Sequence, residues 1–379
     1  MRGFNVVSAA LGLVIGVLAA APASAWIRGP VDVLAVLPFA SGSVEGLTVG
    51  TDGNIYVPTF GFNGNGAIPG PPVLFVISPN GSIVRQVAIT CTQLCGFPPN
   101  VTVSPHILGL RFNPSTSRLW VLDFGDKLVL EVDPQTGITT RVLAGPITGS
   151  GLNALTFDSV GNGYVSDSFN GAIWKIGPTG GIVGNAPWIT DPLLSPSTIP
   201  GTSLTPPFGA NGVEFSNDGN TLFVANTAYH QIIQIPVKQS GGTLTPDPSN
   251  PPSIFITGIN APDGIAIDSK DNIWICANQE DEIVVIDKTG KVIAKLGDFR
   301  GIDQNGIARG FLFPASLAFN KDRSTLYVSN LTLYLPFAGV PHKAIDSDWT
   351  LQVKGGYTVS KLPAQIPSSQ NDQGNQNNQ

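Results

Sequence analysis

The residues best suited to chemistry are two acids and two amides that occupy one position of an internal repeat: Glu45, Asn153, Asn211 and Asp263. Two carboxylates held close together repel each other, and each raises the pKa of the other unless a cation lies between them. Asparagine adds neutral carbonyl ligands, so the set offers only oxygen atoms. This chemistry predicts one divalent cation, with Ca²⁺ preferred and Mg²⁺ second. The absence of His and Cys at this position argues against zinc and copper.

A plainer interpretation treats the four as ordinary residues at the start of strands, because Asn and Asp are common in turns. Their shared place in the repeat favours the metal site. The two other copies carry Leu108 and Ala315 at this position, so the predicted ring of side chains is polar at four places and apolar at two.

The elements that must position these residues come from the repeat. Six copies start at Glu45, Leu108, Asn153, Asn211, Asp263 and Ala315. Each copy has two short strands rich in β-branched and aromatic residues around a turn, and successive copies lie 45 to 63 residues apart. That spacing suits one propeller blade. The sequence therefore predicts an all-β fold over residues 26–362, a six-bladed β-propeller with four-stranded antiparallel blades. A strand in VDVLAVL, from Val31, is expected to join the last blade and close the ring.

Two further positions of the repeat are expected to be architectural. The third residue of each copy is an apolar anchor: Leu47, Leu110, Leu155, Val213, Ile265 and Leu317. The residue before each anchor is small, as the innermost strands of a propeller require where they crowd together: Gly46, Gly109, Ala154, Gly212, Gly264 and Ser316. Five copies end their second strand on Asp or Asn, which predicts hydrogen bonds to the local turn: Asp123, Asp167, Asn226, Asn278 and Asn330.

The two ends of the chain differ in composition from the repeat. Residues 1–25 have the layout of a secretory signal peptide, with an apolar run followed by Ala23-Ser24-Ala25. An uncleaved anchor is the alternative. We expect a mature protein that starts at Trp26, lies in the periplasm or outside the cell, and does not bind a membrane after cleavage. Residues 363–379 are mostly Gln, Asn, Ser and Pro, which predicts a disordered tail.

The charge pattern limits the partners. The chain has 20 Lys and Arg against 26 Asp and Glu, a net charge of −6, and no basic patch. Nucleic acid is therefore excluded as a partner, because nothing would neutralise the phosphates. We expect a monomer that binds a small molecule.

Two long connections belong to the first blade, residues 61–72 and 90–105, and they are either a lid over one face or plain insertions. The second contains Cys91 and Cys95, which in an oxidising compartment would form a small-loop disulfide and otherwise stay free thiols. His106 follows in SPHILGL, near the expected channel mouth. It is either a proton carrier or an incidental loop histidine.

Several of these motifs carry a family resemblance. Glu45-Gly46, Asn153-Ala154, Asn211-Gly212 and Asp263-Gly264 are similar to the motifs of the gluconolactonase/regucalcin family, also called the senescence marker protein family. The resemblance implies a divalent metal at the channel mouth on those four polar residues, and hydrolysis of a lactone or related ester. It also implies that Asp263 doubles as base or nucleophile. Gly151 stands where the family often has a sugar-binding Arg, which points to a less polar substrate.

A second function is compatible with the same repeat. Propellers of the NHL type share the blade pattern and often only bind partners. A non-catalytic binding module with a structural cation is therefore the alternative to a metal-dependent hydrolase.

Overall fold

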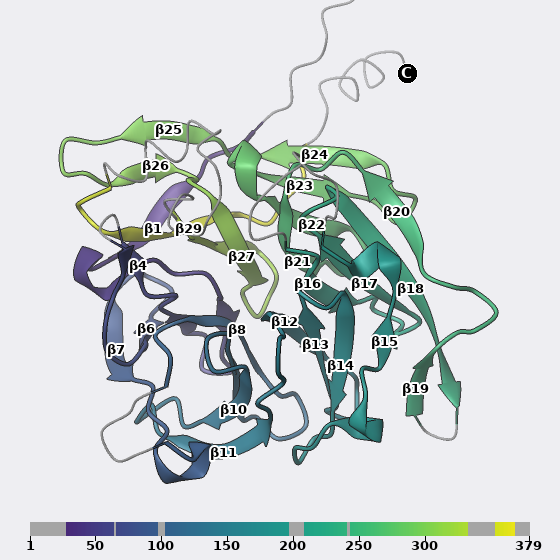
Figure 1. Cartoon of the computed structure of the whole chain (residues 1–379). Coiled ribbons are helices and arrows are strands. Elements are labelled where there is room, and N and C mark those ends of the chain that lie inside the picture. Colours follow the sequence, from purple (N-terminus) through teal and green to yellow (C-terminus); the bar gives the residue numbers. More distant parts are fainter. Residues whose placement is uncertain are drawn as a thin grey trace, which may run out of the picture.

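The computed structural model describes residues 28–63, 66–97, 103–196, 208–240, 243–332 and 353–367. These residues form six antiparallel sheets arranged around a central axis (Figure 1). Five of the sheets have four strands and one has five. The predicted six-bladed β-propeller is confirmed. The signal-peptide segment and most of the predicted tail lie outside the described residues.

Each blade runs from an inner strand at the axis to an outer strand at the rim. The inner strands are β2 (Thr48–Val49), β8 (Ile107–Phe112), β12 (Leu152–Phe157), β16 (Ala210–Phe215), β21 (Pro262–Ile267) and β27 (Pro314–Phe319). The second strands are β3 (Ile55–Pro58), β9 (Leu119–Asp123), β13 (Gly163–Asp167), β17 (Thr221–Asn226), β22 (Ile273–Ala277) and β28 (Thr325–Asn330). The third strands are β6 (Val73–Ile77), β10 (Leu128–Val132), β14 (Ala172–Ile176), β18 (Gln231–Ser240), β23 (Glu282–Ile286) and β29 (Tyr357–Pro363). The outer strands are β7 (Ile83–Ala88), β11 (Thr139–Ala144), β15 (Ile189–Thr190), β20 (Ser253–Thr257), β24 (Val292–Leu296) and β1 (Asp32–Leu37).

An aspartate fixes the turn between the first two strands in several blades. In the fifth blade Asp268 accepts hydrogen bonds from the backbone N–H groups of Lys270 and Asn272 at 2.8 and 3.0 Å. Its other carboxylate oxygen accepts from the indole of Trp274 at 3.0 Å. The turn is thereby tied to a fully buried side chain of the next strand, and Asp158 repeats the arrangement in the third blade with Tyr164. Between blades, buried aliphatic and aromatic side chains form the core.

The last blade closes the ring with strands from both ends of the chain. Its order is β1-β29-β28-β27, so the strand expected in VDVLAVL pairs with the C-terminal strand. The sheet continues to Pro363, and the Ala364 N–H donates to the carbonyl of Ser324 at 2.9 Å. Ile366 also packs against the core, so the fold extends slightly into the segment predicted as tail.

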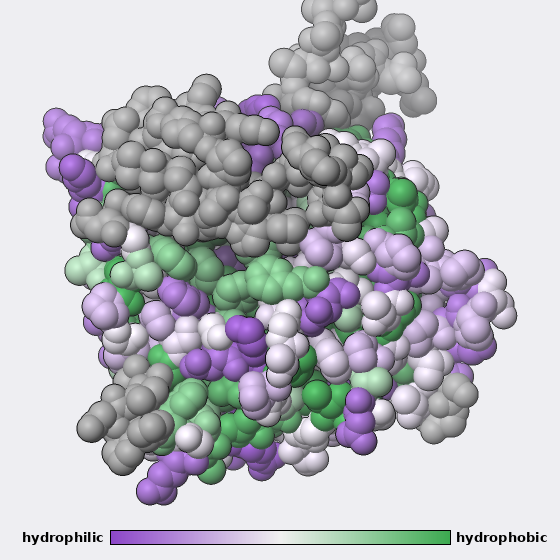
Figure 2. All heavy atoms as spheres, in the orientation of Figure 1, coloured by the Kyte–Doolittle hydropathy of each residue, from purple (hydrophilic) through white to green (hydrophobic). Residues whose placement is uncertain are grey.

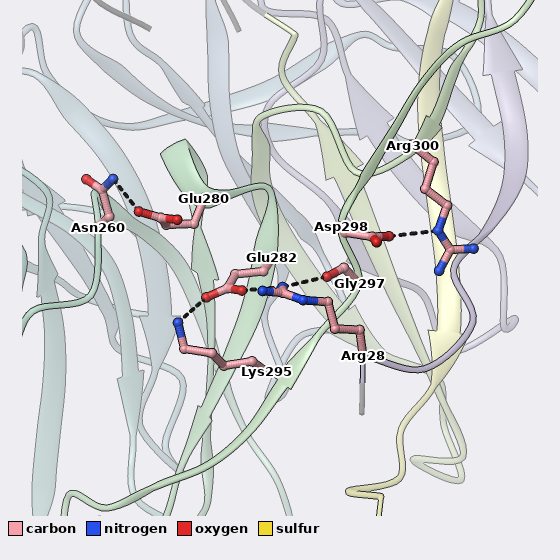
Figure 3. Close-up of polar contacts among 8 residues, drawn as sticks. All are labelled: Arg28, Asn260, Glu280, Glu282, Lys295, Gly297, Asp298 and Arg300. Carbon is pink, nitrogen blue, oxygen red and sulfur yellow. Dashed lines mark hydrogen bonds and ion pairs between the residues drawn. The ribbon is translucent and has the colours of Figure 1, made fainter. Parts of the chain in front are cut away.

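Arg28, at the start of the described chain, ties that end to the fifth blade (Figure 3). Its guanidinium forms an ion pair with Glu282, which is 1% exposed, and donates to the carbonyl of Gly297 at 3.0 Å. Lys295 pairs with the other oxygen of Glu282 at 2.6 Å. The buried carboxylate therefore has two cationic partners, one from each side.

The axis is as crowded as the small residues of the repeat predicted. A Cβ atom added at Gly46 would lie 2.1 Å from the Leu108 carbonyl oxygen of the next blade. At Gly212 it would lie 2.2 Å from the carbonyl oxygen of Asp263. Each of these glycines therefore abuts the backbone of the following blade, and a larger side chain would push the inner strands apart.

The long connections of the first blade contain short elements. β4 (Phe62–Asn63) pairs with β5 (Gly66–Ala67) in the first connection. The second contains the 3₁₀ turn η2 (Gln93–Cys95), and Cys91 and Cys95 are joined by a disulfide. A further hairpin of β25 (Phe299–Ile302) and β26 (Ala308–Gly310) lies between the fifth and sixth blades. β19 (Thr243–Pro246) pairs antiparallel with the C-terminal part of β18. The other 3₁₀ turns are η1 (Phe39–Ser41), η3 (Val183–Asn185), η4 (Pro192–Leu194) and η5 (Asn278–Glu280). The described residues contain no helix with the length and apolar character of a membrane span.

Candidate functional site

Six residues at the start of the inner strands form what we call the axial ring: Glu45, Leu108, Asn153, Asn211, Asp263 and Ala315. The structure places the four polar members as the repeat predicted, in buried positions no more than 6% exposed. The inner strands contact one another all the way around, from β2 through β8, β12, β16 and β21 to β27 and back to β2. The ring is therefore continuous.

A second set of six residues, the mouth column, lies beside the axial ring. In every blade the residue before the axial-ring residue pairs with a residue at the end of the second strand. The residue that follows this partner in the sequence belongs to the mouth column. Each column residue also donates its backbone N–H to the carbonyl two positions before the ring residue. The members, from the first blade to the sixth, are Phe60, Phe124, Ser168, Thr227, Asn278 and Leu331. Blades three to five are therefore polar here, and blades six, one and two are apolar.

The two hydroxyls of the mouth column orient the two amides of the axial ring. Ser168 donates to the carbonyl of Ala210 at 2.6 Å, so its oxygen is left to accept from the Asn153 side-chain NH₂ at 3.2 Å. Thr227 likewise accepts from the Asn211 side-chain NH₂ at 3.0 Å and donates its hydroxyl to the carbonyl of Pro262 in the next blade. With its nitrogen held in this way, the Asn153 carbonyl oxygen has no hydrogen-bond partner although it is buried. Such an oxygen is available to a ligand on the axis.

Asp263 has one oxygen satisfied and one without a partner. Its Oδ2 accepts from the Asn278 side chain at 2.8 Å, whereas Oδ1 is buried and unpartnered. Burial raises the pKa of Asp263 to about 7, although the side-chain amides of Asn278 and Asn211 beside it lower it. Burial, and then the charge of Asp263, raise the pKa of Glu45 well above its ordinary value. The two acids therefore lie close enough to repel each other in a desolvated place.

These side chains fit a hard divalent cation. Two buried carboxylates supply the charge, and amide oxygens supply neutral ligands. A cation would also satisfy the unpartnered oxygens of Asn153 and Asp263, which are otherwise a cost to folding. Within the described ranges no three His, Cys, Asp or Glu side chains cluster as a metal site of that kind requires. The four polar ring residues combine two acids with two amides instead.

The prediction of local turn bonds at the ends of the second strands is confirmed at three positions, Asp123, Asp167 and Asn226. Asp167, for example, accepts from the N–H groups of Gly151, Phe169 and Asn170, which is a local turn role. Asn330 instead accepts from the N–H of Leu312 and donates to the side chains of Thr358 and Ser360.

Asn278 also departs from the prediction. The strands of the fifth blade pair Pro262 with Ala277, so Asn278 lies one residue further along. It belongs to the mouth column and donates to Asp263.

The other side of the mouth is apolar. Leu108 and Ala315 of the axial ring pack with Phe60, Phe313 and Leu331. At Gly151, an added Cβ atom would lie 2.8 Å from the ring of Phe169. The space beside that glycine is therefore filled by an aromatic ring. His106 lies at this mouth, as expected, and is half-buried against Phe60 and Phe62.

Comparison with known proteins found one matching family and several similar lactonases. Residues 205–297 match the family described as SMP-30/Gluconolactonase/LRE-like region. That segment includes Asn211 and Asp263. The chain is 30% identical over 145 residues to the lactonase drp35 of Staphylococcus haemolyticus, and 28% identical over 147 residues to that of Staphylococcus aureus. Each match covers 38% of this chain and 41% of the relative, so the chain spans about two fifths of the curated relatives.

Solved structures show the same fold over most of the chain. The calcium-binding protein regucalcin from Agrobacterium tumefaciens superposes with a TM-score of 0.55 at 17% identity, covering 87% of this chain and 95% of that one. A gluconolactonase from Xanthomonas campestris gives a TM-score of 0.53 at 14% identity, covering 88% and 89%. Residues 205–297 are therefore similar to the SMP-30/gluconolactonase/LRE-like family, as the motifs predicted, and the solved structures share the propeller fold.

Proposed function

We propose that this protein is a hydrolase of lactones or related esters that uses one divalent cation, Ca²⁺ before Mg²⁺, at the axial ring. The observation that carries the proposal is the pair of buried, unpartnered oxygens on Asn153 and Asp263 beside a second buried acid, Glu45. The names of the staphylococcal and Xanthomonas relatives supply the reaction class.

In this proposal the axial ring binds the cation and the mouth column orients its ligands. Glu45, Asn153, Asn211 and Asp263 would hold the cation, which supplies a Lewis acid for the carbonyl oxygen of the substrate. Ser168 and Thr227 keep the amide oxygens of their asparagines turned to the axis. Asn278 holds Oδ2 of Asp263, which leaves Oδ1 directed at the ligand side.

Asp263 is also our proposed proton acceptor. Water attacks the carbonyl carbon and gives a proton to Asp263. The bond between that carbon and the ring oxygen then breaks, and the proton passes from Asp263 to the leaving oxygen, which gives a hydroxy acid. Burial raises the pKa of Asp263 in the metal-free chain. A bound cation favours the ionised form and therefore lowers that pKa.

The test combines binding with turnover on the protein purified from residue 26 onward. Calorimetric titration should show Ca²⁺ binding tighter than millimolar, and Asn153→Ala should weaken it. Initial rates on a panel of lactones and aryl esters should depend on the added cation and should fall at least ~100-fold in Asp263→Ala. Cation binding without turnover on any substrate would favour the non-catalytic binding module. Absence of binding would refute the site itself.

We also propose that the protein is exported to the periplasm or beyond. The support is the signal-like segment of residues 1–25 and the disulfide between Cys91 and Cys95, which persists in oxidising compartments. N-terminal sequencing of protein from the native host should begin at Trp26. Intact Met1 in a cytoplasmic fraction would contradict the proposal.

A further inference from the structure

We propose that the aromatic rings along the channel mouth are a binding surface for an apolar alkyl or aryl group on the substrate. The inference deepens the proposed function and rests on it. The substrate class is then a lactone or ester that carries such a group next to its carbonyl end. We call the surface the aromatic wall and define it as Phe60, Phe62, Phe124, Phe169 and Phe208.

The wall is continuous from ring to ring. Phe62 lies 5.1 Å from Phe60, and Phe60 lies 6.0 Å from Phe124, as measured between ring centroids. Phe124 contacts Phe169 at 5.6 Å and Phe208 at 6.4 Å, and those two lie 5.6 Å apart. The five rings come from loops or strand ends of four blades, so only the folded propeller brings them together.

The wall belongs to the candidate site because of where its members stand. Phe60 and Phe124 are mouth-column residues, in the places that Ser168, Thr227 and Asn278 hold on the polar side. Phe60 also packs with Leu108 and Ala315 of the axial ring. A ligand whose carbonyl reached the polar ring residues would therefore have its remaining atoms beside these rings.

The wall is partly open to solvent, as a binding surface must be. Phe60 is 8% exposed, and the other four rings are half-buried. Figure 2 shows hydrophobic residues in a band across this view of the molecule, over the region where Figure 1 labels β4 and β27. Partly exposed aromatic rings in contact with one another bury more apolar surface when an alkyl or aryl group covers them, which favours such ligands.

His106 fixes one end of the wall. Its ring stacks on Phe62 with centroids 4.5 Å apart and planes 13° apart, and its Nδ1 lies 2.7 Å from the carbonyl oxygen of Phe60. Since a carbonyl only accepts, Nδ1 carries the proton in this contact. The histidine thereby holds both Phe60 and Phe62 in place, and we assign it a positioning role.

Gly151 completes the argument for an apolar ligand. The Phe169 ring lies where a side chain at position 151 would have to begin. No charged or hydrogen-bonding side chain can project from position 151 unless that ring moves. At this position the ring of Phe169 therefore stands in place of a polar side chain.

The experiment measures kcat/KM for a series of γ-lactones whose alkyl side chain grows from none to hexyl. The wild type should gain about fourfold per methylene, the factor expected when one methylene leaves water for an apolar surface, until the wall is covered. Phe124→Ala and Phe169→Ala should reduce the gain to less than about twofold per methylene. The rate on the unsubstituted lactone is the reference against which the gain per methylene is measured for each protein.

Phe157→Ala is the matched control. Phe157 is also a half-buried phenylalanine of the third blade, but it packs edge-on against Trp120 at the other end of β12. It should keep the wild-type dependence on chain length. A His106→Ala variant should lose part of the gain, and His106→Phe, which can still stack on Phe62, should recover some of it.

The outcomes separate this inference from the proposed function. Hydrolysis that does not depend on chain length in the wild type would overturn the aromatic wall and leave the lactonase intact. An equal loss of chain-length dependence in Phe157→Ala would also overturn it. If no lactone is hydrolysed, the proposed function fails, and calorimetry with 2-alkylcyclopentanones decides the wall alone. Dissociation constants that fall with chain length would support it, and a constant value would overturn it.

Discussion

The substitution Asp263→Asn should stabilise the metal-free protein and destabilise the Ca²⁺-bound protein. The two side chains have nearly the same shape, so the exchange mainly removes a charge. The carbonyl oxygen of the new amide can still accept the hydrogen bond that Asn278 donates to Oδ2 of Asp263. In the metal-free protein the buried carboxylate lowers the free energy of unfolding, because burial raises its pKa from 3.8 to about 7. In the Ca²⁺ form the same carboxylate is a ligand.

The sign follows from proton uptake. Between about pH 4 and pH 7 the folded metal-free protein holds a proton on Asp263 that the unfolded chain has released, so stability falls as the pH rises through this window. Below about pH 4 both states are protonated and the cost vanishes. For an Asp pKa that rises from 3.8 to about 7, the cost is at most roughly 4 kcal/mol at pH 8 and at most roughly 2 kcal/mol at pH 5.

The assay is urea unfolding of wild type and Asp263→Asn at pH 8 and pH 5, each in EDTA and in millimolar Ca²⁺. In EDTA at pH 8 the variant should be the more stable protein by a few kcal/mol, and its advantage should shrink at pH 5. In Ca²⁺ the order should invert, because only the wild type retains both acidic ligands. A variant that is less stable than wild type in EDTA at pH 8 would refute the electrostatic reasoning. An equal gain from Ca²⁺ in both proteins would refute the ligand role of Asp263.

Three further substitutions test contacts that hold the cation ligands or the propeller in place. Asn278→Ala should weaken Ca²⁺ binding by about 10–100-fold, the usual cost of losing a group that orients a ligand, and calorimetry checks this. Gly212→Ala should lower the free energy of unfolding by roughly 1–3 kcal/mol, because the new Cβ meets a carbonyl at 2.2 Å, and urea unfolding measures it. Arg28→Ala should cost about 1–2 kcal/mol by leaving Glu282 with one partner, and thermal unfolding should show a lowered midpoint. Arg300→Ala, which removes an exposed ion pair, is the control and should change stability by less than about 1 kcal/mol.

The axial ring was predictable from the sequence because propeller symmetry converts a column of the repeat into a ring in space. Once the apolar anchors are aligned, the residues two places earlier must lie at one height, since every inner strand starts at the same end of the channel. The same symmetry predicted the small residues, which the backbone contacts of Gly46 and Gly212 explain.

Propeller symmetry alone misplaces Asn278, because the turn between the first two strands differs in length from blade to blade. Strand pairing joins Val213 to Val224 in the fourth blade but Ile265 to Ile275 in the fifth. The fifth blade therefore reaches the end of its second strand one residue sooner. Alignment on the second strand instead of the first would have moved Asn278 out of the turn column.

The aromatic wall left no such trace in the sequence. Phe62 and Phe208 lie outside the repeat, and nothing in their spacing relates them to Phe124. Their contact depends on loops that start from four different blades and return to one mouth. Local patterns predict the position of a side chain along its own strand, but they do not predict where a long connection ends above the channel.

The placement of Glu45 shows why the site depends on the whole ring. It is the ring member from the first blade, and it precedes β2 outside any regular strand. Its backbone carbonyl accepts a hydrogen bond from the hydroxyl of Ser329 in the last blade, the blade that pairs β29 with β1. Closure of the propeller by its two ends therefore helps to fix one of the two buried acids. Because a cation at the ring would need Glu45 in place, cation binding and ring closure should stabilise each other.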